Sequence, residues 1–434
     1  MIELAKELYP INRSITGEGI EKSFAIFKRI HPEFNVLSFQ TGEKVFDWQV
    51  PNVWNIKDAY IEHESGKRFC EFTTNNLHVV GYSEPINTVI SKQELLEHLH
   101  WREDLPSAIP YITSYYKRTW GFCISHEEFE KMPDGKYHCF IDSSLSNGKM
   151  NLIEAILPGK SSEEIFFSSY LCHPSMANNE LSGPVVLSEI LEYIKSIPKR
   201  FYTYRFVLVP ETIGSIAYLS RRLNSLKDHV IAGYNLSCVG DERRFTHLQS
   251  RSGNTLADQA LAAAIKNKDR VVTKSFSFRG SDERQYNAPG IDLPVCGFSR
   301  SKYGDYPEYH TSLDDFNVVT QKGLQGSLDV MKDIIDAFET GIYPVIKVLT
   351  EPQLGKRGLY PNLSNSTASV EDSRLINDLS IRMDVTAHSD GKTTIFSIAD
   401  LAECSLRKIL EEVSILSTAN LVTCSHTKKE IINT

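Results

Sequence analysis

Short apolar runs and helical patterns alternate through the middle of the chain. Four mostly apolar runs predict buried strands, at residues 164–171, 204–209, 229–236 and 293–298. Between the first two, apolar residues recur at helical spacing, at Val185, Ile190, Leu191 and Ile194. Strands that alternate with helices predict an α/β fold, with a mostly parallel sheet flanked by helices.

The pattern changes between residues 40 and 132. Tryptophan, tyrosine and valine alternate with polar residues there, and glycine and proline recur, which predicts a β-rich inserted domain with one helix near residues 93–100. Residues 1–39 and 133–345 are predicted to form one domain around this insert. Within the first part, Thr16 is predicted to cap a helix whose apolar face carries Ile20, Phe24, Phe27 and Ile30.

Residues 346–434 are predicted to form a small separate domain. Its polar start at residues 362–373 is typical of a linker, and two helical patterns at 398–403 and 405–416 precede a short strand at 419–423. This order is similar to a winged helix. Acidic and basic residues are nearly balanced in this part of the chain, whereas DNA binding requires a basic face. We therefore expect a docking or dimerisation module, and a homo-oligomer is possible.

The composition is that of an ordinary globular protein. A length of 434 residues predicts roughly two or three domains, and a net charge of −8 without a long run of like charges favours neither a nucleic acid nor a membrane as partner. No apolar stretch is long enough to span a bilayer, and the first ten residues lack a secretory pattern. Eight cysteines without a Cys-x-x-Cys pair are typical of reduced thiols. These features predict a cytoplasmic location.

Candidate catalytic residues follow the predicted strands. His173 stands after the first strand with Glu180 seven residues later, Glu211 stands after the second, and His310 lies in the loop after the fourth. Ligands of parallel sheets bind at the carboxyl ends of the strands. Imidazole and carboxylate groups are zinc ligands, and a further carboxylate can activate water. Cys172 is expected to point away from this site because successive strand residues face opposite sides.

Short motifs extend this set of residues. They are His173, Leu181-Ser182-Gly183, Glu211 with Gly214-Ser215, Ser281-Asp282, and His310-Thr311. In this order they resemble the zinc aminopeptidases that hold two co-catalytic metals. The whole chain more closely resembles an aminopeptidase-like family associated with polysaccharide biosynthesis, which carries a β-rich insert and a winged-helix-like tail. The strongest matches to that family are at residues 46–48, 76–78, 114–116 and 120–123.

The chain departs from the two-metal pattern at three positions. Asn179 stands where those enzymes have the bridging aspartate, and Thr212 and Ser237 replace two further carboxylates. A neutral amide oxygen is a poor zinc ligand. The resemblance therefore implies one zinc ion, with Glu211 as general base. The predicted zinc ligands are His173, Glu180 and His310.

Several further residues are predicted to line a substrate pocket: Asn179, Arg279, Asp282, Tyr303 and Tyr309. The resemblance implies a zinc-dependent hydrolase of an amide or peptide bond, acting on a small-molecule or short peptide-like amide. Two alternatives remain open. One is a mononuclear zinc enzyme that forms or cyclises amides, and the other is a non-catalytic zinc-containing binding protein in polysaccharide biosynthesis.

Overall fold

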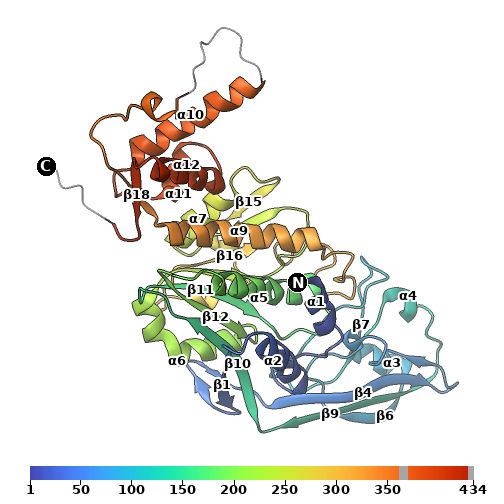
Figure 1. Cartoon of the computed structure of the whole chain (residues 1–434). Coiled ribbons are helices and arrows are strands. Elements are labelled where there is room, and N and C mark those ends of the chain that lie inside the picture. The colour runs from blue at the N-terminus through green and yellow to red at the C-terminus, as the bar shows by residue number, and fades with distance from the viewer. Residues whose placement is uncertain (361–369, 429–434) are drawn as a thin grey trace.

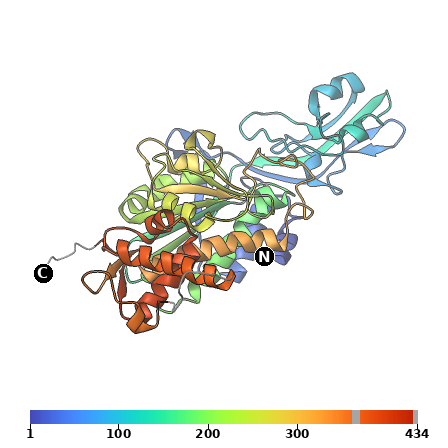
Figure 2. The ribbon, with the colours of Figure 1, turned by 90° about the horizontal axis from the view of Figure 1, so that it is seen from above.

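The computed structural model describes residues 1–360 and 370–428, with the side chains of residues 370–376 excepted. The linker predicted at residues 362–373 lies for most of its length outside this range. The C-terminal domain and the β-rich insert lie at opposite ends of a central α/β domain (Figures 1 and 2).

An eight-stranded mixed sheet forms the centre of the molecule. Its strand order is β1 (Asn35–Gln40), β10 (Lys149–Leu157), β12 (Thr203–Val209), β11 (Glu164–Tyr170), β13 (Val230–Leu236), β16 (Val295–Ser299), β14 (Phe245–Leu248) and β15 (Val271–Lys274). The four central strands, β12 to β16, are parallel, whereas β1, β10 and β14 pair antiparallel with their inner neighbours. The predicted α/β fold and its four buried strands are confirmed.

Helices cover both faces of this sheet. The ring of Phe166 on β11 stacks on Tyr218 of α6 (Ile213–His229), while Ser169 on the same strand lies against Gly183 of α5 (Ser182–Lys195). Since residues three apart on a strand face opposite sides, α5 and α6 lie on opposite faces. Helices α1 (Ile2–Leu8) and α9 (Gln321–Thr340) contact α5, and α7 (Leu256–Ile265) contacts α9.

The insert is built on a second, antiparallel sheet with its own apolar core. The strand order is β5 (Arg68–Phe69), β4 (Val53–His63), β9 (Lys136–Ser146) and β6 (Ile86–Ser91). Strand β9 lies beyond residue 132, and a turn at residues 147–148 leads from it directly into β10 of the central sheet. One polypeptide stretch therefore joins the two sheets.

Smaller elements complete the insert. They are β2 (Lys44–Val45), β3 (Trp48–Gln49), β7 (Leu99–His100), β8 (Phe122–Cys123) and α4 (His126–Phe129). The helix predicted near residues 93–100 is one α-turn, α3 (Lys92–Leu95), followed by a 3-10 turn at Leu96–His98.

The predicted cap of the first amphipathic helix is wrong. Helix α2 (Glu18–Ile30) begins after Gly17, and the Thr16 hydroxyl instead contacts the Tyr82 hydroxyl and accepts the Trp54 backbone N–H. A Cβ on Gly17 would lie 2.1 Å from the Trp54 carbonyl oxygen, and its φ is +96°. The Thr16 hydroxyl, which the local sequence assigns to the helix cap, is therefore bonded to residues of the insert. At position 17, only glycine fits the close approach to Trp54.

The C-terminal domain has winged-helix order. It comprises α10 (Val370–His388), α11 (Ile395–Leu401), α12 (Leu406–Thr418) and β18 (Val422–Ser425), which pairs with β17 (Tyr343–Ile346). The apolar side chains of Leu406, Ile409, Val413 and Leu416 on α12 are buried, and α12 contacts α7 and α9. Its Arg407 pairs with Asp333 and Asp336 of α9. This packing fixes the domain against the central one.

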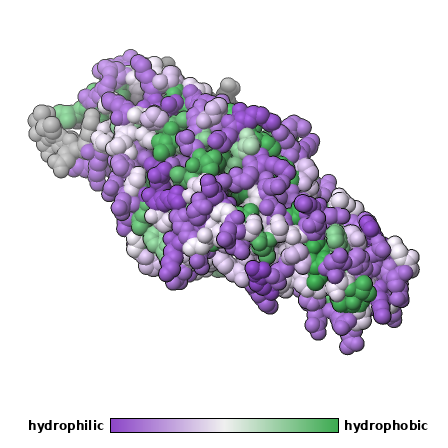
Figure 3. Space-filling model, turned by 90° about the horizontal axis from the view of Figure 1, so that it is seen from below, coloured by the Kyte–Doolittle hydropathy of each residue, from purple (hydrophilic) through white to green (hydrophobic). Residues whose placement is uncertain are grey.

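The face of the molecule shown in Figure 3 is mostly hydrophilic, with apolar patches between the polar regions. Among the described residues, no helix has both the length and the apolar character needed to cross a membrane.

Candidate functional site

Two buried histidines from different loops face a common space. His173 follows β11 and His310 lies in the loop after β16, with ring centroids 5.5 Å apart. The ring of Tyr111 lies 5.1 Å from each of them. The Nε2 atom of His310 is buried without a hydrogen-bond partner in the described part of the chain. Burial, and secondarily the nearby His173, lower the pKa of His310 to about 3, so this ring is neutral and able to act as a ligand.

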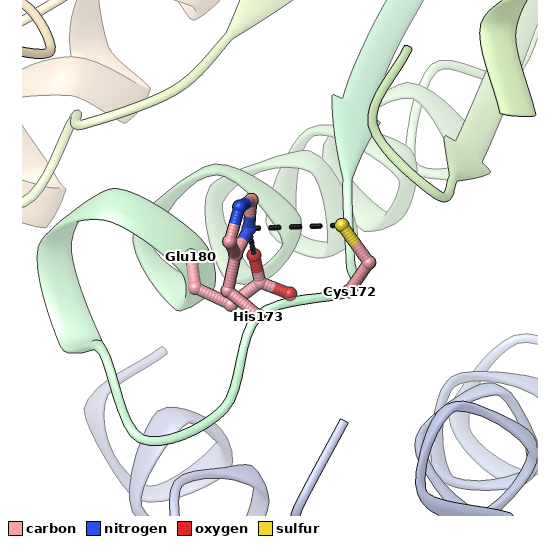
Figure 4. A group of neighbouring side chains, drawn as sticks. All are labelled: Cys172, His173 and Glu180. Atoms are coloured by element: carbon pink, nitrogen blue, oxygen red, sulfur yellow. Dashed lines mark hydrogen bonds and ion pairs between the residues drawn. The ribbon is translucent and has the colours of Figure 1, made fainter. Parts of the chain in front are cut away.

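The Nδ1 nitrogen of His173 is hydrogen-bonded to the carboxylate of Glu180. This nitrogen lies 2.7 Å from Glu180 Oε2 (Figure 4). Glu180 Oε1 lies 3.6 Å from Arg13 Nε. All three side chains are buried. A carboxylate on one ring nitrogen fixes the tautomer and leaves the other nitrogen free for a metal. Glu180 therefore has the position of a group that orients His173 through Oε2, while its Oε1 is buried without a hydrogen-bond partner in the described part of the chain.

The expected direction of Cys172 is wrong. Its sulfur lies 3.6 Å from His173 Nδ1 (Figure 4). The same sulfur accepts the backbone N–H of Glu211 at 3.2 Å. Strand β11 ends at Tyr170, so the alternation of faces no longer applies two residues later. Burial raises the pKa of Cys172 to about 11, which keeps a neutral thiol beside the histidine.

Glu211 stands opposite Nε2, the second ring nitrogen of His173. Its Oε2 lies 3.6 Å from His173 Nε2, and its Oε1 accepts a hydrogen bond of 2.7 Å from the Ser281 hydroxyl. Burial raises the pKa of Glu211, although His173 and Ser281 oppose this shift. The Glu211 side chain is 23% exposed. A fixed, partly open carboxylate with a raised pKa is suited to accept a proton from water.

Asp282 lies beneath the turn that follows Glu211 and does not face open space. Its Oδ1 accepts the Thr212 N–H and the Ser215 hydroxyl, each at 2.7 Å. Thr212 has a φ of +65°, which is unfavourable for a β-branched residue. Burial, then repulsion from Glu211, raises the pKa of Asp282 to about 8. The carboxyl therefore shapes the turn that presents Glu211, and substrate contact remains a prediction.

Asn179 presents a free oxygen from a π-helical turn, residues Ala177–Leu181. Its Nδ2 donates to the Tyr170 hydroxyl at 2.7 Å and its backbone N–H donates to Asp314 Oδ2 at 2.8 Å, whereas its Oδ1 is buried without a partner. Asp314 also accepts the Asn178 N–H at 2.6 Å. These bonds hold the turn so that the amide oxygen of Asn179 remains available.

The remaining predicted pocket residues divide into two groups. Tyr309 lies at the histidine pair, with its ring stacked on His310 at a centroid distance of 3.9 Å. Tyr303 and Arg279 lie along the segment that contains Ser281. The Tyr303 hydroxyl donates to Glu283 at 2.6 Å, and Arg279 is exposed, with its guanidinium 4.9 Å from the Phe276 ring centroid.

The insert reaches into this site through Tyr111, a residue that the sequence did not indicate. The Tyr111 N–H donates to the His310 carbonyl at 2.8 Å, and Pro110 forms a β-bridge with Thr311. The insert therefore fixes the loop that carries His310 and contributes the Tyr111 ring. Tyr111 stands within a segment of irregular structure, so neither periodicity nor a motif distinguishes it.

A second buried group lies between β14, α7 and β16. His247 Nε2 is 3.0 Å from Asp258 Oδ1, and Cys296 is nearby. Asp258 also accepts from the Thr255 N–H at the start of α7 and from the Ser250 hydroxyl. These contacts identify Asp258 mainly as a helix-capping group.

The fold is that of the zinc aminopeptidases. A zinc aminopeptidase from Bacillus subtilis superposes with a TM-score of 0.55 at 14% identity, covering 77% of this chain and 92% of that one. An M28 peptidase precursor from Shewanella amazonensis superposes with a TM-score of 0.53 at 13% identity, covering 76% and 90%. Identities this low establish the fold alone.

The family is established by closer matches. Residues 2–341 match a domain of unknown function, DUF4910, and residues 342–424 match a winged helix-turn-helix. The chain belongs to the DUF4910 family. A Clostridium acetobutylicum protein is 37% identical over 409 residues, or 94% of this chain and 92% of that protein, and its provisional description is polysaccharide biosynthesis protein with an aminopeptidase-like domain.

A crystal structure from the same organism, of a protein provisionally described as a peptidase, covers 97% of this chain and 95% of its own. It is 35% identical and superposes with a TM-score of 0.87. The aminopeptidase-like fold with a C-terminal winged helix, predicted from the sequence, is confirmed.

Proposed function

We propose that this protein is a zinc-dependent hydrolase of an amide or peptide bond. The observation that carries the proposal is the meeting of His173, His310 and Glu211 at the carboxyl ends of parallel strands, with the Nε2 atom of His310 unpartnered and that of His173 3.6 Å from Glu211. Imidazole pairs beside a carboxylate suit zinc chemistry. The zinc aminopeptidase fold supports the same function.

The donor atoms at this site are of the types that zinc binds. His173 and His310 would hold it through Nε2, and the third protein ligand would be either Glu180, as the sequence predicts, or the free Oδ1 of Asn179. Zinc supplies Lewis-acid activation of water and of the substrate carbonyl. Asn179 Oδ1 and Glu180 Oε1 are both buried without a hydrogen-bond partner among the described residues, and a carboxylate is the better zinc ligand of the two.

Glu211 would transfer the proton. Its Oε2 faces the space next to His173, and Ser281 holds its other oxygen, so the carboxylate has one fixed orientation. It would accept a proton from the attacking water and then donate it to the departing amine nitrogen. Tyr309 and Tyr111, which pack on the histidine rings, would restrict the access of further water to this space.

The Glu211→Gln variant tests this role. It should retain zinc and fold while losing about 10²–10⁴-fold in turnover, the usual contribution of a general base. Turnover would be followed on a panel of aminoacyl p-nitroanilides and N-acylated amino sugars, with exposed Glu18 changed to Gln as the matched control. Release of zinc by Glu211→Gln would identify Glu211 as a ligand and contradict the assignment.

The two alternatives predict other outcomes. An amide-forming or cyclising zinc enzyme would convert a substrate with a free amine and would also depend on Glu211. A zinc-containing binding protein in polysaccharide biosynthesis would bind a ligand without converting it. The replacement of three carboxylate positions by Asn179, Thr212 and Ser237 is the observation that favours this second alternative.

We also propose a small-molecule or short peptide-like substrate, no nucleic-acid or membrane partner, and a cytoplasmic location. All eight cysteines are free, as is usual in a reducing compartment. A role in polysaccharide biosynthesis is supported by the description of the Clostridium relative.

A further inference from the structure

A cationic pocket opens beside the segment that holds Glu211. Its volume is about 590 Å³, and three of its lining residues are arginines, Arg251, Arg279 and Arg284. Trp48 and Phe276 provide aromatic walls, and no carboxylate lines the pocket within the described residues. Since the whole chain has a net charge of −8, this concentration of positive charge contrasts with the overall composition.

The segment of residues 279–284 contributes to the pocket and also contacts the catalytic carboxylate. Ser281 donates to Glu211 at 2.7 Å, and Arg284 Nη2 donates to the Thr212 hydroxyl at 2.9 Å. Thr212 directly follows Glu211 in the sequence. A group bound by Arg279 or Arg284 would therefore lie beside the segment that positions Glu211.

Two of the arginines have no acidic partner within the described residues. Arg279 rests over the Phe276 ring, and Arg284 bonds to the neutral Thr212 hydroxyl. Arg251 is instead paired with Asp292. An arginine that is held in place but not neutralised is ready to bind a carboxylate or phosphate through two parallel hydrogen bonds.

The insert supplies the opposite wall. Trp48 on β3 is 41% exposed, which is high for a tryptophan. Its hairpin is fixed to other elements, since the neighbouring Gln49 carbonyl accepts the Tyr116 hydroxyl and Glu43 pairs with Arg221 of α6 at 2.9 Å. A fixed, exposed indole offers a flat surface on which the apolar face of a sugar or other ring can pack.

We propose that this pocket binds an oxyanion carried by the substrate, a carboxylate or phosphate attached to a ring that packs on Trp48. The substrate would then be an acidic amide, such as an acidic amino sugar bearing an N-acyl group. This assignment rests on the proposed function, because the bound anion is part of a substrate only if the protein is an enzyme. The binding itself requires no turnover, so it can be measured independently.

Calorimetric titration of the full-length protein tests the pocket. The ligands would be glucuronate and glucose 1-phosphate, with neutral glucose for comparison. At least one anion should bind, glucose should not, and added NaCl should weaken the binding because the arginines are exposed. Tighter binding of glucuronate would identify a carboxylate as the natural group, and tighter binding of glucose 1-phosphate would identify a phosphate.

Variants locate the binding. Arg279→Gln should weaken anion binding by about tenfold or more, as expected for loss of a charge-assisted hydrogen bond. Trp48→Leu should weaken binding of glucuronate or glucose 1-phosphate and leave inorganic phosphate unaffected. Arg29→Gln, an exposed arginine on α2, should have no effect.

Two results would overturn the proposal: equal binding of glucose and both anions, or unchanged affinity in Arg279→Gln. The Glu211→Gln variant separates the two claims. Anion binding that persists in an inactive Glu211→Gln protein supports both, whereas anion binding by a wild type that converts no amide supports the pocket and contradicts the proposed function.

Discussion

Replacement of Glu180 by glutamine separates an orienting carboxylate from a metal ligand. Glu180 bonds to His173 Nδ1 at 2.7 Å and lies 3.6 Å from Arg13, with all three side chains buried. Glutamine keeps the size and one oxygen acceptor but removes the charge. Two consequences follow, one for zinc affinity through His173 and one for stability through Arg13.

The magnitudes can be worked from these contacts. Loss of a partner that orients a metal-binding histidine weakens metal affinity by about 10–100-fold, which corresponds to about 1.4–2.7 kcal/mol. Removal of one member of a buried ion pair costs about 3–5 kcal/mol of unfolding free energy. Arg13 retains hydrogen bonds to the Leu8 and His173 carbonyls, so we expect the lower end, about 3 kcal/mol.

Zinc affinity would be measured by competition with a chromogenic chelator, and stability by chemical unfolding. Half-exposed Glu189 changed to Gln is the matched control. The double variant Arg13→Met, Glu180→Gln should recover stability because it leaves no unpaired buried charge. Zinc affinity in Glu180→Gln equal to wild type would refute the orienting role, and complete loss of zinc, as in His310→Ala, would show that Glu180 is a ligand.

Three further predictions concern stability and the C-terminal domain. Burial raises the pKa of Asp258, but hydrogen bonds from His247 and Ser250 outweigh it and hold the pKa at about 2. A lowered carboxyl pKa gives stability that is present above pH ~4 and lost as the pH falls towards ~2, so Asp258→Asn should cost about 2 kcal/mol at neutral pH; an unchanged acid-unfolding curve would contradict this. A chain ending at Gly341 should associate or lose solubility in size-exclusion chromatography because α7 and α9 lose the cover of α11 and α12; a monodisperse monomer would argue against that packing. The full-length protein should show no salt-sensitive shift of duplex DNA, since Arg407 of α12 is paired with α9; a shift that disappears on truncation would reverse this expectation.

The sequence predicted those parts of the fold that depend on local pattern. The four central strands and the helix predicted at residues 405–416 were recognisable because buried strands and amphipathic helices carry regular apolar signals. The hydroxyl of Thr16 was assigned incorrectly because its actual partners, Tyr82 and Trp54, come from the insert. Local capping rules cannot anticipate a competing contact from a distant segment.

The candidate site shows the same limit. His173, Glu211 and His310 were located because each follows a predicted strand, and the structure brings them together. The position of Glu180 depends on Arg13, which is far away in the sequence and becomes its neighbour only in the folded chain. The direction of the Cys172 side chain depends on the exact residue at which β11 ends. A shift of this end by one residue changes the direction.

The zinc content of the purified protein tests the central claim most directly. Elemental analysis after mild dialysis should give a ratio near one zinc per chain, because Thr212 and Ser237 replace two carboxylates of the two-metal pattern. His173→Ala and His310→Ala should each abolish this zinc, while Glu211→Gln should retain it. A stable ratio near two, or zinc retained in both histidine variants, would contradict a single site built on these two imidazoles.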